Sequence, residues 1–114
     1  MEPTRPKHSP TLNVLRHLIA EGDVKISAHG YDELAEYELQ AQSLIANLDD
    51  AILIEDYPLF PKGPCVLVLQ RDIEQRPVHV VWGIPKGHTG PAVLIDAYRP
   101  DDERWDEGFT RRKR

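Results

Sequence analysis

Cysteine is nearly absent from this sequence, and several other signals are missing as well. A single cysteine, Cys65, excludes an intrachain disulfide and a structural zinc site built from several cysteines. No apolar run approaches the ~20 residues that cross a membrane, and the polar start MEPTRPKHSP lacks the apolar core of a signal peptide. Neither a Gly-rich phosphate loop nor an HExxH zinc motif occurs. These absences predict a cytoplasmic protein that has no membrane contact, no bound metal and no other cofactor.

Positive charge is scarce outside the last four residues. The formal net charge is −5, but residues 111–114 are all basic, and without them 10 basic residues face 19 acidic ones, a net charge of −9. Proteins that bind nucleic acid non-specifically are usually basic over the contact face. The acidic body therefore disfavours RNA as a partner over a broad surface, while a local basic site stays compatible with it.

Composition divides the chain into an arm, a domain and a tail. Residues 1–10 hold three prolines and little apolar content, which predicts a flexible arm. Residues 11–109 have the size of one domain with one core. Residues 110–114 form a basic tail, interpreted either as a solubilising end or as a contact for a phosphate backbone or an acidic partner.

Two hydrophobic periodicities predict an α+β fold. Apolar residues three and four apart predict helices over 11–21, 29–38 and 40–49, with Thr11 and Ser27 as N-caps of the first two. Apolar runs bounded by Pro, Gly or Asp predict strands at 24–27, 51–55, 65–71, 77–84 and 92–98. A short helix is expected after residue 100, with Trp105 and Phe109 four residues apart. The expected architecture is therefore N-terminal helices packed on a mostly antiparallel sheet.

Two polar residues stand out at the centre of the predicted strands, His79 and Asp96. Side chains alternate along a strand, which puts His79 on one face with Val81, and Asp96 on one face with Leu94 and Tyr98. A buried polar group needs a partner. His79 thus either bonds a backbone carbonyl or Asp96 within the core, or acts from a cleft as a general acid or base, since histidine titrates near neutral pH.

His29 and Glu33 lie four residues apart and therefore share one face of the predicted second helix. That spacing offers two ligands to a metal ion, but two ligands do not make a site. A simple pair within the helix is the favoured interpretation.

Four basic residues, Arg71, Arg76, Lys86 and Arg99, flank the ends of predicted strands. Together they are able to form a small phosphate site in an otherwise acidic protein. The alternative is a set of surface ion pairs with the many carboxylates.

Five segments resemble, in order, a bacterial family of small domains of unknown function. They are ISAHGYDEL (26–34), AILIEDYP (51–58), CVLVLQR (65–71), RPVHVVWG (76–83) and LIDAYRPDDERW (94–105). They are similar to the family's S-x-H helix start, its acidic strand ending in Tyr-Pro, its central strand, its R-P-x-H-V-V strand and its Y-x-P-x-x-x-x-W close. The resemblance covers roughly residues 24 to 105.

That family is similar in architecture to the RelE- and BrnT-like ribonuclease toxins of toxin–antitoxin pairs. The resemblance implies helices followed by a curved antiparallel sheet, and metal-independent RNA cleavage on its concave face. It makes His29, His79 and Tyr98 the catalytic candidates. It makes Arg71 and Arg99 the candidate RNA contacts and an antitoxin-like protein the expected partner, and Lys86 joins these contacts from the set of four basic residues.

The sequence departs from the family at two positions that often carry arginine, and this leaves two functional hypotheses. Family members often carry arginines in the pattern H-x-x-x-R-x-x-x-R, whereas this chain has Glu33 and Tyr37 there, so two charges that stabilise a cleavage transition state are missing. The first hypothesis, favoured by the resemblance, is a toxin-type module that acts on RNA. The second, favoured by the acidic body and apolar strands, is a non-enzymatic protein–protein interaction module or homo-oligomer.

Overall fold

The computed structural model describes residues 9–106 and 108–112. The expected arm lies outside the described residues except for Ser9 and Pro10, and so do the last two residues of the basic tail. The elements follow in the order α1 (Pro10–Ala20), β1 (Val24–Ile26), α2 (Ala28–Glu36), α3 (Ala41–Ala46), the 3₁₀ turn η1 (Leu48–Asp50), β2 (Ile52–Tyr57), β3 (Cys65–Arg71), β4 (Pro77–Gly83) and β5 (Ala92–Tyr98).

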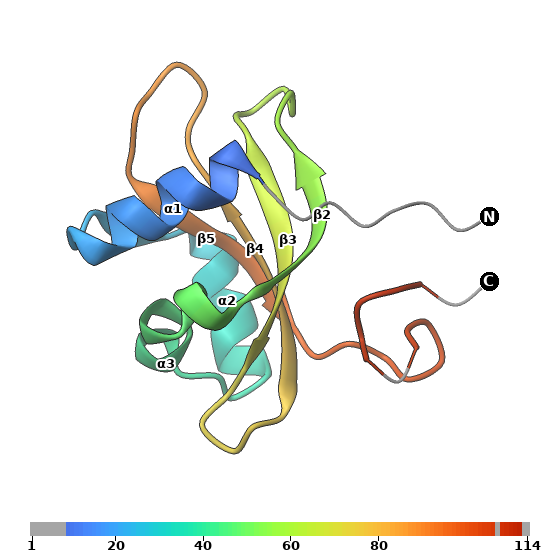
Figure 1. Cartoon of the computed structure of the whole chain (residues 1–114). Coiled ribbons are helices and arrows are strands. Elements are labelled where there is room, and N and C mark those ends of the chain that lie inside the picture. Colours follow the sequence, from blue (N-terminus) through green and yellow to red (C-terminus); the bar gives the residue numbers. More distant parts are fainter. Residues whose placement is uncertain (1–8, 107, 113–114) are drawn as a thin grey trace, which may run out of the picture.

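The strands form one five-stranded sheet in the order β1-β5-β4-β3-β2. All neighbours run antiparallel except β1, which runs parallel to β5. The helices lie on one side of the sheet, and the C-terminal segment (residues 99–106 and 108–112) lies on the other (Figure 1). The predicted α+β class with a mostly antiparallel sheet is thus confirmed.

Most of the predicted elements are present, with two differences at their ends. Helix α1 begins one residue earlier than expected, because Ser9 and not Thr11 is its N-cap and accepts from the backbone N–H of Leu12 at 3.1 Å. The expected late helix is wrong. Asp101 instead accepts from the Glu103 N–H, and Asp106 from the Gly108 N–H, so local side-chain bonds replace helical ones in a series of turns.

Two cores lie on the two faces of the sheet. The larger one joins the helices to β3, β4 and β5, and its fully buried side chains include Leu15, Leu44, Val68, Trp82 and Leu94. The smaller one lies under the C-terminal segment and consists of Ile54, Leu67, Leu69 and Trp105, with Val81 and Phe109 partly buried beside them. Both faces of β3 are therefore covered, which explains its uninterrupted apolar run.

A buried amide joins α3 to the sheet. The Trp82 indole N–H donates to Gln70 Oε1 at 2.8 Å, and Gln70 Nε2 donates to the Leu44 carbonyl at 2.7 Å and to Asn47 Oδ1. Each buried polar group in this chain of bonds has a partner, so the network fixes the helix without leaving an unpaired group in the core.

Helix α2 lies along the edge of β5 at the point where β1 ends. Ile26 is the last β1 residue paired with β5, opposite Leu94, and the Ser27 N–H then donates to the Leu94 carbonyl at 3.0 Å. Gly30 brings the helix backbone so close that a Cβ on this residue would lie 2.7 Å from the Leu94 carbonyl oxygen. A glycine at this position therefore sets the distance between α2 and the sheet. None of the described helices has the length and hydropathy that crossing a bilayer requires.

Replacing Gly30 with alanine tests this close approach. Because the opposing atom belongs to the backbone, we expect Gly30→Ala to push α2 away and to lower the free energy of unfolding by about 1–3 kcal/mol, measured by urea denaturation. Gly108→Ala is the control, since its added methyl would meet nothing nearer than 3.7 Å, and it should stay within about 0.5 kcal/mol of the wild type. Equal stabilities for wild type and Gly30→Ala would contradict the packing.

Candidate functional site

The junction between β1 and α2 places His29 beside β5. Ser27 is the N-cap of α2, as predicted: its hydroxyl oxygen accepts from the Gly30 N–H at 2.9 Å. The same hydroxyl donates to the Ile95 carbonyl at 3.1 Å. One side chain thus starts the helix and ties it to the neighbouring strand, and His29, in the first turn, is held against the edge of β5.

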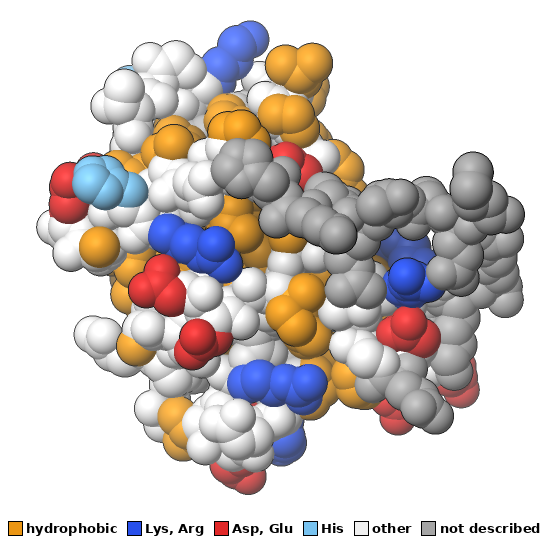
Figure 2. Space-filling view, viewed as in Figure 1, with side chains coloured by type: hydrophobic (Ala, Val, Ile, Leu, Met, Phe, Trp, Pro, Cys, Tyr) orange, Lys and Arg blue, Asp and Glu red, His pale blue; other side chains and the backbone are white. Residues whose placement is uncertain are grey.

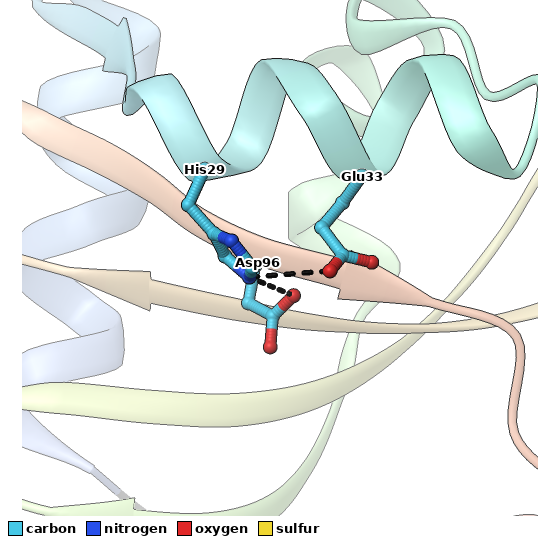
Figure 3. A group of neighbouring side chains, drawn as sticks. All are labelled: His29, Glu33 and Asp96. Carbon is cyan, nitrogen blue, oxygen red and sulfur yellow. Dashed lines mark ion pairs between the residues drawn. The ribbon is translucent and has the colours of Figure 1, made fainter.

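His29, Glu33 and Asp96 form a compact cluster across the α2–β5 junction (Figure 3). The Nε2 atom of His29 lies 3.2 Å from Glu33 Oε1, one helical turn away, and 3.2 Å from Asp96 Oδ1 on the strand. The imidazole is 61% exposed, while the two carboxylates are largely shielded. The cluster therefore combines a solvent-accessible acid/base group with two fixed negative charges.

The environment of the cluster disfavours its negative charge. Burial raises the pKa of Glu33, the nearby Asp96 carboxylate raises it further, and a positive His29 opposes both effects. Asp96 Oδ1 is buried and has no hydrogen-bond partner among the described residues. The site therefore brings together carboxylate oxygens whose negative charge a bound proton or cation would neutralise.

A β-bulge explains why Asp96 is available to His29. In β5, Asp96 pairs with Val81 whereas Leu94 pairs with Trp82, so Ile95 is an extra residue in the ladder. The expected alternation along 92–98 is therefore wrong beyond Leu94. Leu94 and Ala97 both reach the larger core, and Asp96 turns out of it.

His79 lies in the smaller core and is closed to solvent. Its exposed fraction is 0%, and its Nε2 donates to the Phe109 carbonyl at 2.6 Å while Nδ1 accepts from the Tyr98 hydroxyl at 3.3 Å. Trp105 packs edge-on against the imidazole, with the two ring centroids 4.3 Å apart. Of the two partners expected for His79, the backbone carbonyl is the one observed. Asp96, the other, pairs with His29.

The C-terminal segment that covers His79 is held by Arg112. Its guanidinium pairs with Glu55 of β2 at 2.9 Å and stacks over the Trp105 ring at 4.8 Å from the ring centroid. Trp105 and Arg112 also form an isolated β-bridge. Part of the predicted basic tail is therefore fixed on the sheet.

Three of the four basic residues expected at a phosphate site, Arg71, Arg76 and Arg99, lie at the end of the sheet where β3 connects to β4, and they bond to protein groups there. Arg99 and Arg76 both pair with the buried Asp72, at 2.9 and 3.2 Å, and their bonds together with backbone N–H groups hold the pKa of Asp72 below its usual range despite its burial. Arg71, at the end of β3, donates to the Gln75 carbonyl. Lys86 lies in the β4–β5 connection, at the opposite end of the sheet.

Sequence reasoning missed two members of these clusters, Asp72 and Glu55, and the partner of a third, Asp96. Asp96 was marked as a polar residue within a strand, but its partner depends on the bulge. Asp72 and Glu55 carried no signal that distinguished them from the other carboxylates. The structure brings His79 and Tyr98 together in the core and places His29 in a separate cluster on the surface.

The comparisons with known proteins identify the family. The domain of unknown function DUF4258 matches residues 26–99, which is more than half of the chain. The chain belongs to the DUF4258 family. No curated protein and no solved structure matches it. The matched DUF4258 region runs from the end of β1 to the residue after β5, and it includes the His29 cluster and His79 but not Trp105.

Burial of His79 gives a testable dependence of stability on pH. Burial lowers the pKa of His79 below its ordinary value of 6.5, so below that pH the unfolded chain binds a proton that the folded chain excludes. We expect the contribution of His79 to the free energy of unfolding to be constant above about pH 6.5 and to fall as the pH is lowered towards about 5. Urea denaturation of wild type and His79→Gln over this range measures it. An unchanged pH slope in the variant would contradict the assignment.

Proposed function

We propose that this DUF4258 domain is a toxin-type module that acts on RNA, with His29 as its acid/base group. The observation that carries the proposal is the exposed imidazole of His29 held within 3.2 Å of two carboxylates. Histidine bonded to a carboxylate is a recurring acid/base arrangement, because the carboxylate orients the ring and stabilises its protonated form.

RNA cleavage needs such a group. When the 2′-oxygen of a ribose attacks the neighbouring phosphorus, a base must take the proton of the 2′-hydroxyl, and an acid must protonate the 5′-oxygen that leaves. His29 is able to accept the first proton and, once protonated, to return it to the leaving 5′-oxygen. Its exposure leaves room for a single-stranded substrate beside α2. Glu33 and Asp96 hold the ring in place on the protein side.

His79 and Tyr98 support this site from inside in the proposed mechanism. His79 is enclosed under the C-terminal segment and does not meet a substrate in this conformation, and Tyr98 is half-buried beside it with its hydroxyl bonded to His79. Tyr98 lies two residues after Asp96 on β5, and its bond to His79 fixes the end of the strand that carries Asp96. We therefore assign them a positioning role.

Expression in bacteria tests the proposal directly. We expect wild-type protein to arrest growth and deplete RNA, and His29→Ala to lose RNA cleavage by about 100-fold or more, the usual contribution of acid/base catalysis. His17→Ala is the matched control, because His17 forms a similar exposed pair with Glu21 but lies outside the family match. Cleavage of an RNA oligonucleotide by purified protein gives the rate. No arrest by the wild type at any expression level, or equal arrest by His29→Ala, would refute the proposal.

A hollow on the sheet supports a second candidate function, a protein–protein interaction module. Residues from β4, β5 and the β2–β3 connection line an apolar hollow of about 250 Å³, among them Phe60, Gly83, Val93 and Ile95. Leu59 beside it is 91% exposed, and apolar side chains gather where the β2–β3 connection lies (Figure 2). A homo-oligomer or an antitoxin-like partner would bury this surface.

Sedimentation velocity tests the homo-oligomer form of this candidate. We expect the wild type to associate with itself as its concentration rises, and Phe60→Asp to remain monomeric, because a charge in the hollow would be buried without a partner. Ile73→Asp is the control, since Ile73 is also exposed but lies in the β3–β4 connection away from the hollow. A monomeric wild type, or equal association by both variants, would count against it.

A further inference from the structure

We propose that His29, Glu33 and Asp96 bind a divalent transition-metal ion, with Zn²⁺ and Mn²⁺ as the best-matched ions. The inference goes beyond the proposed function and stands on the geometry of the cluster alone. One imidazole nitrogen and two carboxylate oxygens are ligand types that both ions accept.

The distances between donor atoms suit a common ligand. Bonds of about 2.0–2.2 Å to a metal place neighbouring donor atoms about 3–3.5 Å apart. His29 Nε2 lies 3.2 Å from each carboxylate oxygen, and all three donor atoms lie within 4.8 Å of one another. The Glu33 carboxylate, which comes from the helix, and the Asp96 carboxylate, which comes from the strand, both point toward the His29 ring (Figure 3).

The Asp96 oxygen that faces His29 is a further feature of the same cluster, on a side chain that is 32% exposed. Oδ1 is buried, and no described residue gives it a hydrogen bond, although His29 Nε2 is within 3.2 Å. A buried acceptor without a donor is costly and needs an explanation. A metal ion among the three donor atoms satisfies this oxygen and relieves the repulsion between the two carboxylates.

The arrangement also leaves coordination positions open. Three ligands come from the protein, two from one helix and one from the strand beside it, and the exposed side of His29 faces solvent. A site with three protein ligands keeps at least one position for water or for an oxygen of a bound molecule. Should the proposed action on RNA hold, the ion supplies positive charge to a phosphate at a place where the protein itself offers two negative side chains.

Isothermal titration of metal-free protein without an affinity tag, using ZnCl₂ and MnCl₂, tests the site. We expect one ion per chain, and at least tenfold weaker binding after Asp96→Asn and after Glu33→Gln. His17→Ala should bind as the wild type does, because His17 and Glu21 lie 2.7 Å apart and no third ligand joins them among the residues that the structure describes. Circular dichroism of each variant shows whether it is folded, and Glu33→Gln, at a helix surface, serves if Asp96→Asn unfolds. No binding up to about 1 mM, or wild-type affinity in Asp96→Asn and Glu33→Gln, would overturn the proposal.

A parallel RNA assay with and without EDTA separates this inference from the proposed function. Metal binding together with EDTA-sensitive cleavage supports the site and the action on RNA, with His29 then serving as a metal ligand and not as the acid/base group. Metal binding without any RNA cleavage supports the site and refutes the action on RNA. Cleavage that survives EDTA, in a protein that binds no metal, refutes the site and leaves the action on RNA standing.

Discussion

The approach of α2 to the edge of β5 is the constraint on which the surface site depends. Where β1 ends, helix α2 takes its place beside β5. Ser27 links the two, because its hydroxyl accepts from the Gly30 N–H of the helix and donates to the Ile95 carbonyl of the strand. Gly30 allows the two backbones to touch. Without this contact, His29 on the helix and Asp96 on the strand would have no fixed relation, and neither acid/base chemistry nor metal binding would have a defined geometry.

The two histidines within the family match occupy opposite environments. His79 is enclosed, neutral by preference and bonded on both ring nitrogens, which suits a structural role. His29 is exposed and faces two carboxylates. The division follows from the sheet: its second face is closed by the C-terminal segment over β2–β4, while the polar cluster lies where α2 meets β5. Stability and reactivity are thereby assigned to separate parts of a small domain.

The sequence predicted the three long strands well, because each is an apolar run bounded by Pro, Gly or charged residues, and it predicted Ser27 as a helix cap. It failed at the late helix, where aspartates bond nearby backbone N–H groups. It also failed at Asp96, because a bulge at Ile95 reverses the side-chain alternation and no local pattern announces it. Two of the three members of the candidate site, His29 and Glu33, were visible as a helical spacing. The third member depends on a contact between residues far apart in the chain, which one sequence does not reveal.

The cover over the second face of the sheet has a consequence for the order of events during synthesis. Domains generally fold as units, and this sheet is complete only when β5, which lies between β1 and β4, has been made. Trp105 and Arg112 follow β5 in the chain and belong to the segment that covers the second face. A nascent chain that has reached only the end of β5 therefore still exposes the apolar side chains of that face, and the pairing of Arg112 with Glu55 holds the segment that later covers them.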